Sequence, residues 1–210
     1  MNLLLLSLGF GAAHDFLTVA TGRAPEALTI GYLGGAQIPY ADAPWVHSER
    51  ARLAELGCAV VDVSAAELDL DAFTATLDTA DAVYVSGGNI YALLWALRRA
   101  GAADVLAERV RAGLPYIGCS AGSVIVGPSI APIGDMDDPA EAPGPVDPRG
   151  LGLIDHVVIP HADGQLPWYP PERIDRVRTE FGDRFALDFV GDEQAVLVRD
   201  GRTTTIVSGF

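Results

Sequence analysis

The sequence predicts an α/β protein with a doubly wound, mostly parallel sheet and helices on both faces. Short apolar runs alternate along the chain with segments of helical spacing, and each run is continuous rather than alternating in polarity. Continuous runs are typical of strands that are covered on both faces. Because parallel neighbours need long crossover connections, the alternation of strand and helix favours a parallel sheet.

The expected strands are six aliphatic or β-branched runs. They cover residues 3–6, 28–33, 59–63, 82–85, 116–119 and 157–159. The opening segment 1–10 is apolar enough to resemble a signal peptide, but no basic residue precedes its apolar run and Gly9 and Gly11 soon interrupt it. We therefore expect it to form the first buried strand.

The expected helices lie between these strands, at residues 45–56, 71–77, 90–99 and 105–111. Gly57, Gly101 and Gly113 each stand just after a helical pattern. A left-handed C-terminal cap favours a residue without a Cβ atom, so these glycines are expected to mark helix ends.

Two later segments complete the expected architecture. Pro, Gly and acidic residues crowd the stretch 135–152, which we expect to be a long irregular loop near the functional site. Segments 195–199 and 203–207 flank Asp200-Gly201, a strong signal for a type I′ turn, so an antiparallel hairpin is expected at the sheet edge. Residues 1–210 are expected to form one domain.

The net charge and the cysteine content exclude several classes of function. The chain has 28 acidic and 14 basic residues, and its formal net charge of -14 repels nucleic acid and anionic membrane surfaces. No run approaches the roughly 18 apolar residues that a membrane span needs. Cys58 and Cys119 are too few for a disulfide framework and have no metal-ligand spacing, so a cytoplasmic protein is expected.

The strongest chemical motif is Gly118-Cys119-Ser120-Ala121-Gly122. It follows an apolar strand and precedes a helical stretch, the context in which a G-x-S-x-G pattern marks a nucleophile elbow. The glycines permit a sharp turn that exposes the Ser120 hydroxyl, and the N–H of Ala121 would face a developing oxyanion. A plain turn of small residues is the alternative. Cys119 is disfavoured as the nucleophile, since paired glycines do not flank it at this spacing.

A serine nucleophile needs a base, and His161 is the best placed of the four histidines. It follows the strand at 157–159, and reactive sites in open α/β sheets lie beyond the carboxyl ends of the strands, where the serine also falls. His14 and His47 fall in helical segments, and His156 precedes its strand.

A glycine-rich turn, Ser86-Gly87-Gly88-Asn89, follows the strand at 82–85. Its backbone can approach a substrate closely, and the N–H of Gly88 is a candidate second oxyanion donor. An ordinary connection between a strand and a helix is the alternative interpretation.

With these features, the chain resembles the peptidase E family of serine peptidases, also called aspartyl dipeptidases, whose fold is of the class I glutamine amidotransferase type. The resemblance covers most of the chain. It rests on three segments: YVSGGNIYALLWAL at 84–97, PYIGCSAGS at 115–123 and LGLIDHVVIPHAD at 151–163.

The resemblance implies acyl transfer on short peptides, with Ser120 as the nucleophile, His161 as the general base and the N–H groups of Gly88 and Ala121 as the oxyanion hole. Glu193, in GDEQAVLV, matches the family acid that orients the histidine. The other residues that it implies are Asp135 as a second candidate for that acid, and Asn89 and Arg173 as substrate-binding residues. No metal or organic cofactor is implied.

One departure from the family concerns specificity. Aspartate-specific members have an arginine in a segment like ETRxxRI, whereas this chain has WYPPERI at 168–174, with Pro170 in the place of that arginine. Arg173 matches the second arginine of the motif. Because strong selection for a carboxylate needs a fixed cation, strict specificity for N-terminal aspartate is not expected.

Two other functions stay open at this point. One is an amidase or cyanophycinase-like hydrolase of the same structural group. The other is an amidotransferase-like domain that has lost catalysis and acts as a binding module. The presence together of Ser120, His161 and an available acid argues for an enzyme.

Overall fold

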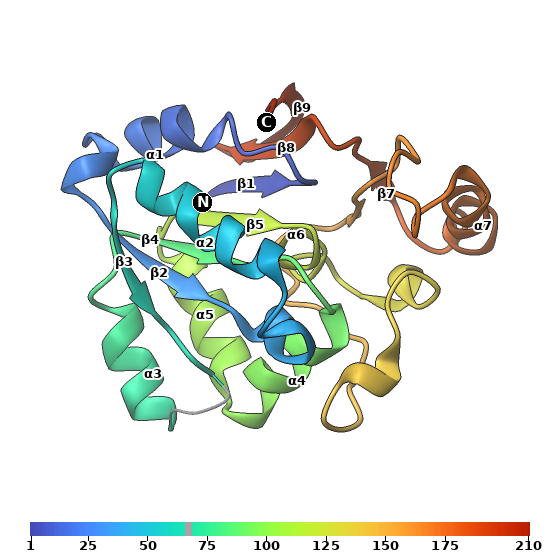
Figure 1. Cartoon of the computed structure of the whole chain (residues 1–210), viewed down its shortest axis with the longest axis horizontal. Helices are drawn as coiled ribbons and strands as arrows, with labels where there is room; N and C mark the ends of the chain where they lie inside the picture. The colour runs from blue at the N-terminus through green and yellow to red at the C-terminus, as the bar shows by residue number, and fades with distance from the viewer. Residues whose placement is uncertain (66–68) are drawn as a thin grey trace.

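The computed structural model describes residues 1–65 and 69–210. Its centre is a seven-stranded sheet with the order β3-β2-β4-β5-β1-β8-β9 (Figure 1). Strands β1 to β5 are parallel to one another, β8 is antiparallel to β1, and β9 is antiparallel to β8. The prediction of a mostly parallel α/β sheet with a C-terminal antiparallel hairpin is confirmed.

The six expected strands and four expected helices all occur, with ends shifted by a few residues, and Gly57, Gly101 and Gly113 have the positive φ of left-handed caps. The strands are β1 (Asn2–Leu6), β2 (Thr29–Leu33), β3 (Ala59–Asp62), β4 (Ala82–Val85), β5 (Tyr116–Cys119), β6 (Val157–Ile159), β7 (Leu187–Phe189), β8 (Gln194–Arg199) and β9 (Arg202–Val207). The helices are α1 (Ala13–Thr21), α2 (Pro44–Glu55), α3 (Leu70–Leu77), α4 (Ile90–Arg99), α5 (Ala102–Arg111), α6 (Ala121–Val124) and α7 (Pro171–Phe181).

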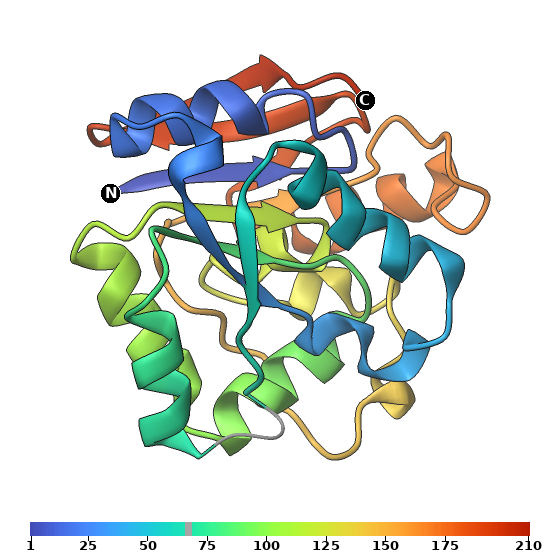
Figure 2. The same cartoon turned by 60° about the vertical axis from the view of Figure 1, so that its left-hand side comes forward.

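Helices cover both faces of the main sheet, as Figure 2 also shows. Side chains of α1 and α2 pack against one face, and side chains of α3, α4 and α5 pack against the other. In β1, Leu4 and Leu6 join the first layer while Leu3 and Leu5 join the second, because successive side chains of a strand point to opposite faces. This two-sided burial explains the continuous apolar run of β1.

The expected hairpin joins β8 to β9. Asp200 and Gly201 have φ values of 52° and 72°, and a type I′ turn requires positive φ at both of these positions. Strand β9 therefore extends the sheet as an antiparallel edge.

Strand β6 does not belong to the main sheet. It pairs in parallel with β7 as a separate two-stranded sheet, although the alternation of strands and helices predicts it in the main one. The short run at β6 indicates burial, and its side chains are buried, but three apolar residues do not identify the strand's partner. No helix of the described ranges is long and apolar enough to cross a membrane.

Candidate active site

Ser120 stands on a strained turn between β5 and α6. Its φ of 46° and ψ of -107° are unusual for a residue with a side chain, and such a conformation costs about 1–3 kcal/mol. The Ser120 N–H donates to the carbonyl of Leu6 at 3.0 Å, and the Ser123 hydroxyl donates to Leu6 and Gly118 carbonyls. These bonds to β1 and β5 hold the turn in place.

The two glycines of the motif are required by close backbone packing. A Cβ atom on Gly118 would lie 2.4 Å from the carbonyl oxygen of Gly122, and one on Gly122 would lie 2.1 Å from that of Val85. Any side chain at either position would push α6 away from β4 and β5. The glycines therefore permit the elbow itself, which favours it over a plain turn of small residues.

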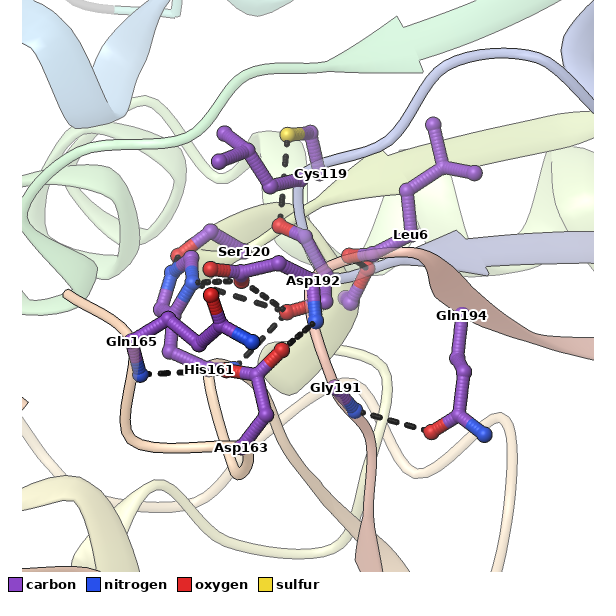
Figure 3. Close-up of polar contacts among 12 residues, drawn as sticks. Leu6, Cys119, Ser120, His161, Asp163, Gln165, Gly191, Asp192 and Gln194 are labelled. Carbon is purple, nitrogen blue, oxygen red and sulfur yellow. Dashed lines mark hydrogen bonds and ion pairs between the residues drawn. The ribbon is translucent and has the colours of Figure 1, made fainter. Parts of the chain in front are cut away.

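His161 lies directly against Ser120. Its Nε2 is 3.0 Å from the Ser120 Oγ, and its backbone φ is also positive, at 59° (Figure 3). Within the described ranges, Asp200 of the hairpin is the third residue other than glycine with positive φ. The other two, Ser120 and His161, contact each other. Residues with strained backbones cluster at functional sites.

A buried carboxylate binds the other nitrogen of His161. Asp192 Oδ1 lies 2.6 Å from His161 Nδ1, and the Ser7 hydroxyl accepts from the His161 N–H and donates to the same carboxylate. Burial by itself would raise the pKa of Asp192, but its interactions with His161 and Ser7 outweigh this, and the pKa lies below its ordinary value. Asp192 is therefore ionised at neutral pH.

Neither of the two acids expected at His161 is there. Glu193 has an exposed side chain, and Asp135 is exposed and pairs with Arg176 at 3.1 Å. Asp192, the neighbour of Glu193, is turned inward because its N–H donates to the Asp163 carboxylate at 2.8 Å. The structure thus places Asp192, rather than Glu193 or Asp135, against His161.

The glycine-rich turn after β4 lies beside the serine. A Cβ atom on Gly87 would lie 3.5 Å from that of Ser120, and Gly88 has a φ of 128° with the carbonyl of Ala36 too close for any side chain. In the part of the chain that the structure describes, the N–H groups of Gly88 and Ala121 have no acceptor. Both expected oxyanion donors are therefore free for a ligand.

A buried carboxyl fixes this turn. Glu49 Oε1 accepts from the Gly87 N–H at 2.9 Å and from the Tyr84 hydroxyl at 2.7 Å, and Oε2 accepts from the Gln37 amide at 2.5 Å. Burial raises the pKa of Glu49. The sequence pattern did not single out this residue, since one acid on a predicted helix normally faces solvent.

Asn89 does not face a substrate, in contrast to the expectation. It is buried, and its side-chain carbonyl accepts from two backbone N–H groups in the first turn of α4. Its side-chain NH2 group donates to the backbone carbonyl of Asp138 and to the carboxylate of Glu141. All its hydrogen-bonding groups are used to begin the helix and to hold the 135–152 loop. Arg173, on α7, is absent from the described residues that line the cavity below.

Cys119 is an inert neighbour of the site. Its sulfur donates to the carbonyl of Ser7, away from His161 (Figure 3). Burial, reinforced by the nearby Glu49, raises the pKa of the Cys119 thiol well above its ordinary value. Because the thiolate is the nucleophilic form, this environment favours Ser120 over Cys119.

Ser120 and His161 open into a cavity of about 820 Å³, within the usual size range of small-ligand sites. Three further groups of side chains form its walls. They are Trp45, Ser48, Glu49 and Arg52 of α2, the loop residues Met136, Asp137, Asp138 and Glu141, and the segment residues Leu166, Trp168 and Tyr169. The Tyr169 ring stacks on His161 with centroids 4.9 Å apart. The expected position of the 135–152 loop near the site is confirmed.

Asp137 is, after Glu49, a second acid of the cavity wall whose pKa is raised. It accepts from the Ile90 N–H at 2.7 Å and from the Tyr169 hydroxyl at 3.3 Å. Burial raises its pKa from 3.8 to about 6. The folded protein therefore keeps a proton on Asp137 over a pH range in which the unfolded chain has lost it.

We expect Asp137→Asn to stabilise the protein at pH 8 but not at pH 4. Because the folded state binds the extra proton between pH 3.8 and about 6, the free energy of unfolding of the wild type falls as pH rises through that window, by about 3 kcal/mol. Thermal unfolding should show a gain of about 5 °C or more in Tm at pH 8. Asp138→Asn, at an exposed neighbour, is the control, and an equal gain there would refute the assignment.

A serine on a strained turn, in contact with a histidine that is bonded to a buried aspartate, is the arrangement of serine hydrolases with an α/β fold. Peptidase family S51 matches residues 26–206 of this chain. The chain belongs to peptidase family S51 and is a serine peptidase.

Individual relatives agree with this assignment. The chain is 35% identical over 162 residues to an uncharacterized peptidase of Listeria innocua, and the aligned region covers 77% of this chain and 76% of the relative. It is 38% identical over 168 residues to peptidase E of Streptomyces coelicolor, covering 77% and 64% of the two chains. A crystal structure of a candidate peptidase E protein from Listeria monocytogenes superposes with a TM-score of 0.86 at 29% identity, over 98% of both chains. The expected peptidase E resemblance is confirmed.

Proposed function

We propose that this peptidase hydrolyses short peptides by acyl transfer through Ser120, His161 and Asp192. The observation that carries the proposal is the continuous line of contacts from the Ser120 hydroxyl to His161, at 3.0 Å, and from His161 to the buried Asp192, at 2.6 Å. Asp192 replaces Glu193 and Asp135 in the proposed triad.

In the proposed mechanism, His161 Nε2 accepts the Ser120 hydroxyl proton as Oγ attacks the carbonyl carbon of the scissile bond. The N–H groups of Gly88 and Ala121 stabilise the oxyanion of the tetrahedral intermediate. His161 then donates the proton to the leaving amine, and a water molecule activated by the same imidazole hydrolyses the acyl-enzyme. Throughout, Asp192 holds the Nδ1–H and stabilises the imidazolium.

A panel of short peptides and simple amides tests this proposal against its alternatives. We expect the peptides to be hydrolysed with the higher kcat/KM, because the cavity of about 820 Å³ offers contacts that a small amide does not use. Faster hydrolysis of simple amides would indicate an amidase instead. Binding of peptides without turnover of any panel member would indicate a binding module.

We expect no strict preference for N-terminal aspartate. Pro170 precedes α7 and supplies no cation, while the carboxyl groups of Asp137, Asp138 and Glu141 on the cavity wall disfavour an anionic side chain nearby. In a matched Xaa-Leu series, uncharged N-terminal residues should give kcat/KM values at least equal to that of Asp-Leu. A hundredfold preference for aspartate, about 2.7 kcal/mol, would contradict this expectation.

The proposed compartment is the cytoplasm. Both cysteines, Cys58 and Cys119, are buried and unpaired, and free thiols are the rule where the surroundings are reducing. Burial raises the pKa of both thiols, which protects them from oxidation.

A further inference from the structure

One cation lies in the wall of the cavity that contains Ser120. Arg52 of α2 is the only arginine or lysine among the described residues that line it. Its guanidinium donates a long hydrogen bond, 3.4 Å, to the carbonyl of Leu8. Within residues 1–65 and 69–210 it forms no ion pair with a carboxylate. The charge of Arg52 is therefore available to a ligand.

Two acids of α2 lie one turn from Arg52, and neither neutralises it. Glu55, one turn later, is exposed and forms no ion pair with Arg52 in the described ranges. Glu49 lies one turn earlier and lines the same cavity, but its carboxyl group already binds the Gly87 N–H, the Tyr84 hydroxyl and the Gln37 amide. Three donors thus hold both oxygens of Glu49 on the turn after β4. A half-buried guanidinium without an anionic partner is costly, and a substrate carboxylate would remove that cost.

The position of Arg52 matches the leaving-group side of the scissile bond. Its hydrogen bond goes to Leu8, and the preceding residue, Ser7, accepts from the His161 N–H. His161 gives its proton to the leaving amine, so the amine must lie on the side of Ser120 that faces His161 and the end of β1. Arg52 is anchored at that same end of β1.

The negative charge of the other cavity walls also favours a substrate carboxylate at Arg52. Asp137, Asp138 and Glu141 line the cavity from the 135–152 loop, and this loop is bonded to Asn89 and Tyr169 rather than to the end of β1. A substrate carboxylate is repelled from that loop and attracted to Arg52. A free dipeptide has one carboxylate two bonds beyond the scissile nitrogen, in the leaving amino acid.

We infer that Arg52 binds the C-terminal carboxylate of a dipeptide substrate and thereby determines specificity for a free C-terminus directly after the scissile bond. This inference rests on the proposed function, since it assigns the leaving amino acid of the same reaction. A guanidinium binds a carboxylate through two parallel hydrogen bonds, which gives both affinity and a fixed orientation.

The test compares Ala-Leu with Ala-leucinamide, which differ only in the charge of the C-terminal group. We expect the wild type to hydrolyse Ala-Leu with a kcat/KM at least tenfold higher. Arg52→Met should remove this preference by lowering kcat/KM for Ala-Leu, mainly through KM, while the value for Ala-leucinamide stays within about twofold. Arg50→Met is the matched control, because Arg50 lies on the same helix but pairs with Asp62 outside the cavity.

Fluorophosphonate labelling of each variant separates the inference from the proposed function. Unchanged labelling of Arg52→Met, together with loss of the preference, supports the role of Arg52. Equal hydrolysis of both substrates by the wild type, or an equal loss for both in Arg52→Met, overturns it while leaving a functional peptidase. If a separate, unlabelled sample of a wild type that reacts with the fluorophosphonate hydrolyses neither substrate, the result counts against the proposed function itself.

Discussion

Replacing Ser120 by alanine is expected to lower kcat for a short peptide by about a millionfold, the size of effect seen when the nucleophile of a serine peptidase is removed. The physical reason is that no other hydroxyl lies at His161 Nε2, and the Cys119 thiol is bonded to the Ser7 carbonyl instead. The measurement is a progress curve for Ala-Leu hydrolysis at high enzyme concentration. Loss of His161 by alanine substitution should lower kcat by several orders of magnitude as well.

The Ser120→Ala variant is also expected to fold normally, which separates loss of catalysis from loss of structure. A serine in the left-handed region is replaced by another residue with a Cβ atom, so the backbone strain at position 120 is unchanged. Its Tm should stay within a few degrees of the wild-type value. Residual activity above about 1% in a folded Ser120→Ala protein would mean that another group acts as the nucleophile.

Asp192→Asn is expected to lower kcat by about ten thousandfold, the loss found when a triad aspartate becomes an amide. The Asp192 carboxylate accepts from His161 Nδ1–H and stabilises the imidazolium, whereas an amide is neutral and favours the wrong tautomer. Glu193→Gln removes the same charge at the next residue, but its side chain is exposed, so kcat should change by less than about threefold.

Steady-state kinetics on the two variants decides between adjacent acids. A large loss in Glu193→Gln with a normal Asp192→Asn would restore Glu193 as the orienting acid. Asp135→Asn belongs in the same series, because Asp135 pairs with Arg176 on the surface and its loss should leave kcat unchanged.

The elbow and the histidine were predictable because local chemistry requires them. Gly118 and Gly122 stand where any Cβ atom would strike a carbonyl, so the motif carries a backbone requirement that can be read from the sequence. The apolar runs before Ser120 and His161 placed both residues at strand ends. His161 lies at the site even though β6 belongs to the smaller sheet, because the carboxyl end of β6 points to Ser120.

The acid that contacts His161 was not predictable from the sequence, because it depends on which side chain of the segment before β8 points inward. Asp192 and Glu193 are adjacent acids before β8, and the one that faces inward is fixed by a bond from Asp192 N–H to Asp163, 29 positions away. Ser7 is likewise placed by the fold: it follows β1 and meets His161 only because β1 lies beside β5. Such long-range contacts leave no periodic signal in the sequence.

The role of Asn89 at the start of α4 has a local sequence signal. An asparagine directly before a helical pattern is a favoured N-cap, and the structure uses it in that way. The family resemblance implied substrate contact instead. The acidic loop that Asn89 holds forms part of the cavity wall, so its influence on the site is indirect.

The most direct test of the account is active-site labelling with a fluorophosphonate, followed by mass mapping of the adduct. The strained turn, the contact with His161 Nε2 and the free N–H groups of Gly88 and Ala121 together activate one hydroxyl toward phosphonylation. We expect a single adduct on the peptide that contains Ser120, and no adduct in Ser120→Ala. An adduct on any other residue, or none on the folded wild-type protein, would contradict it.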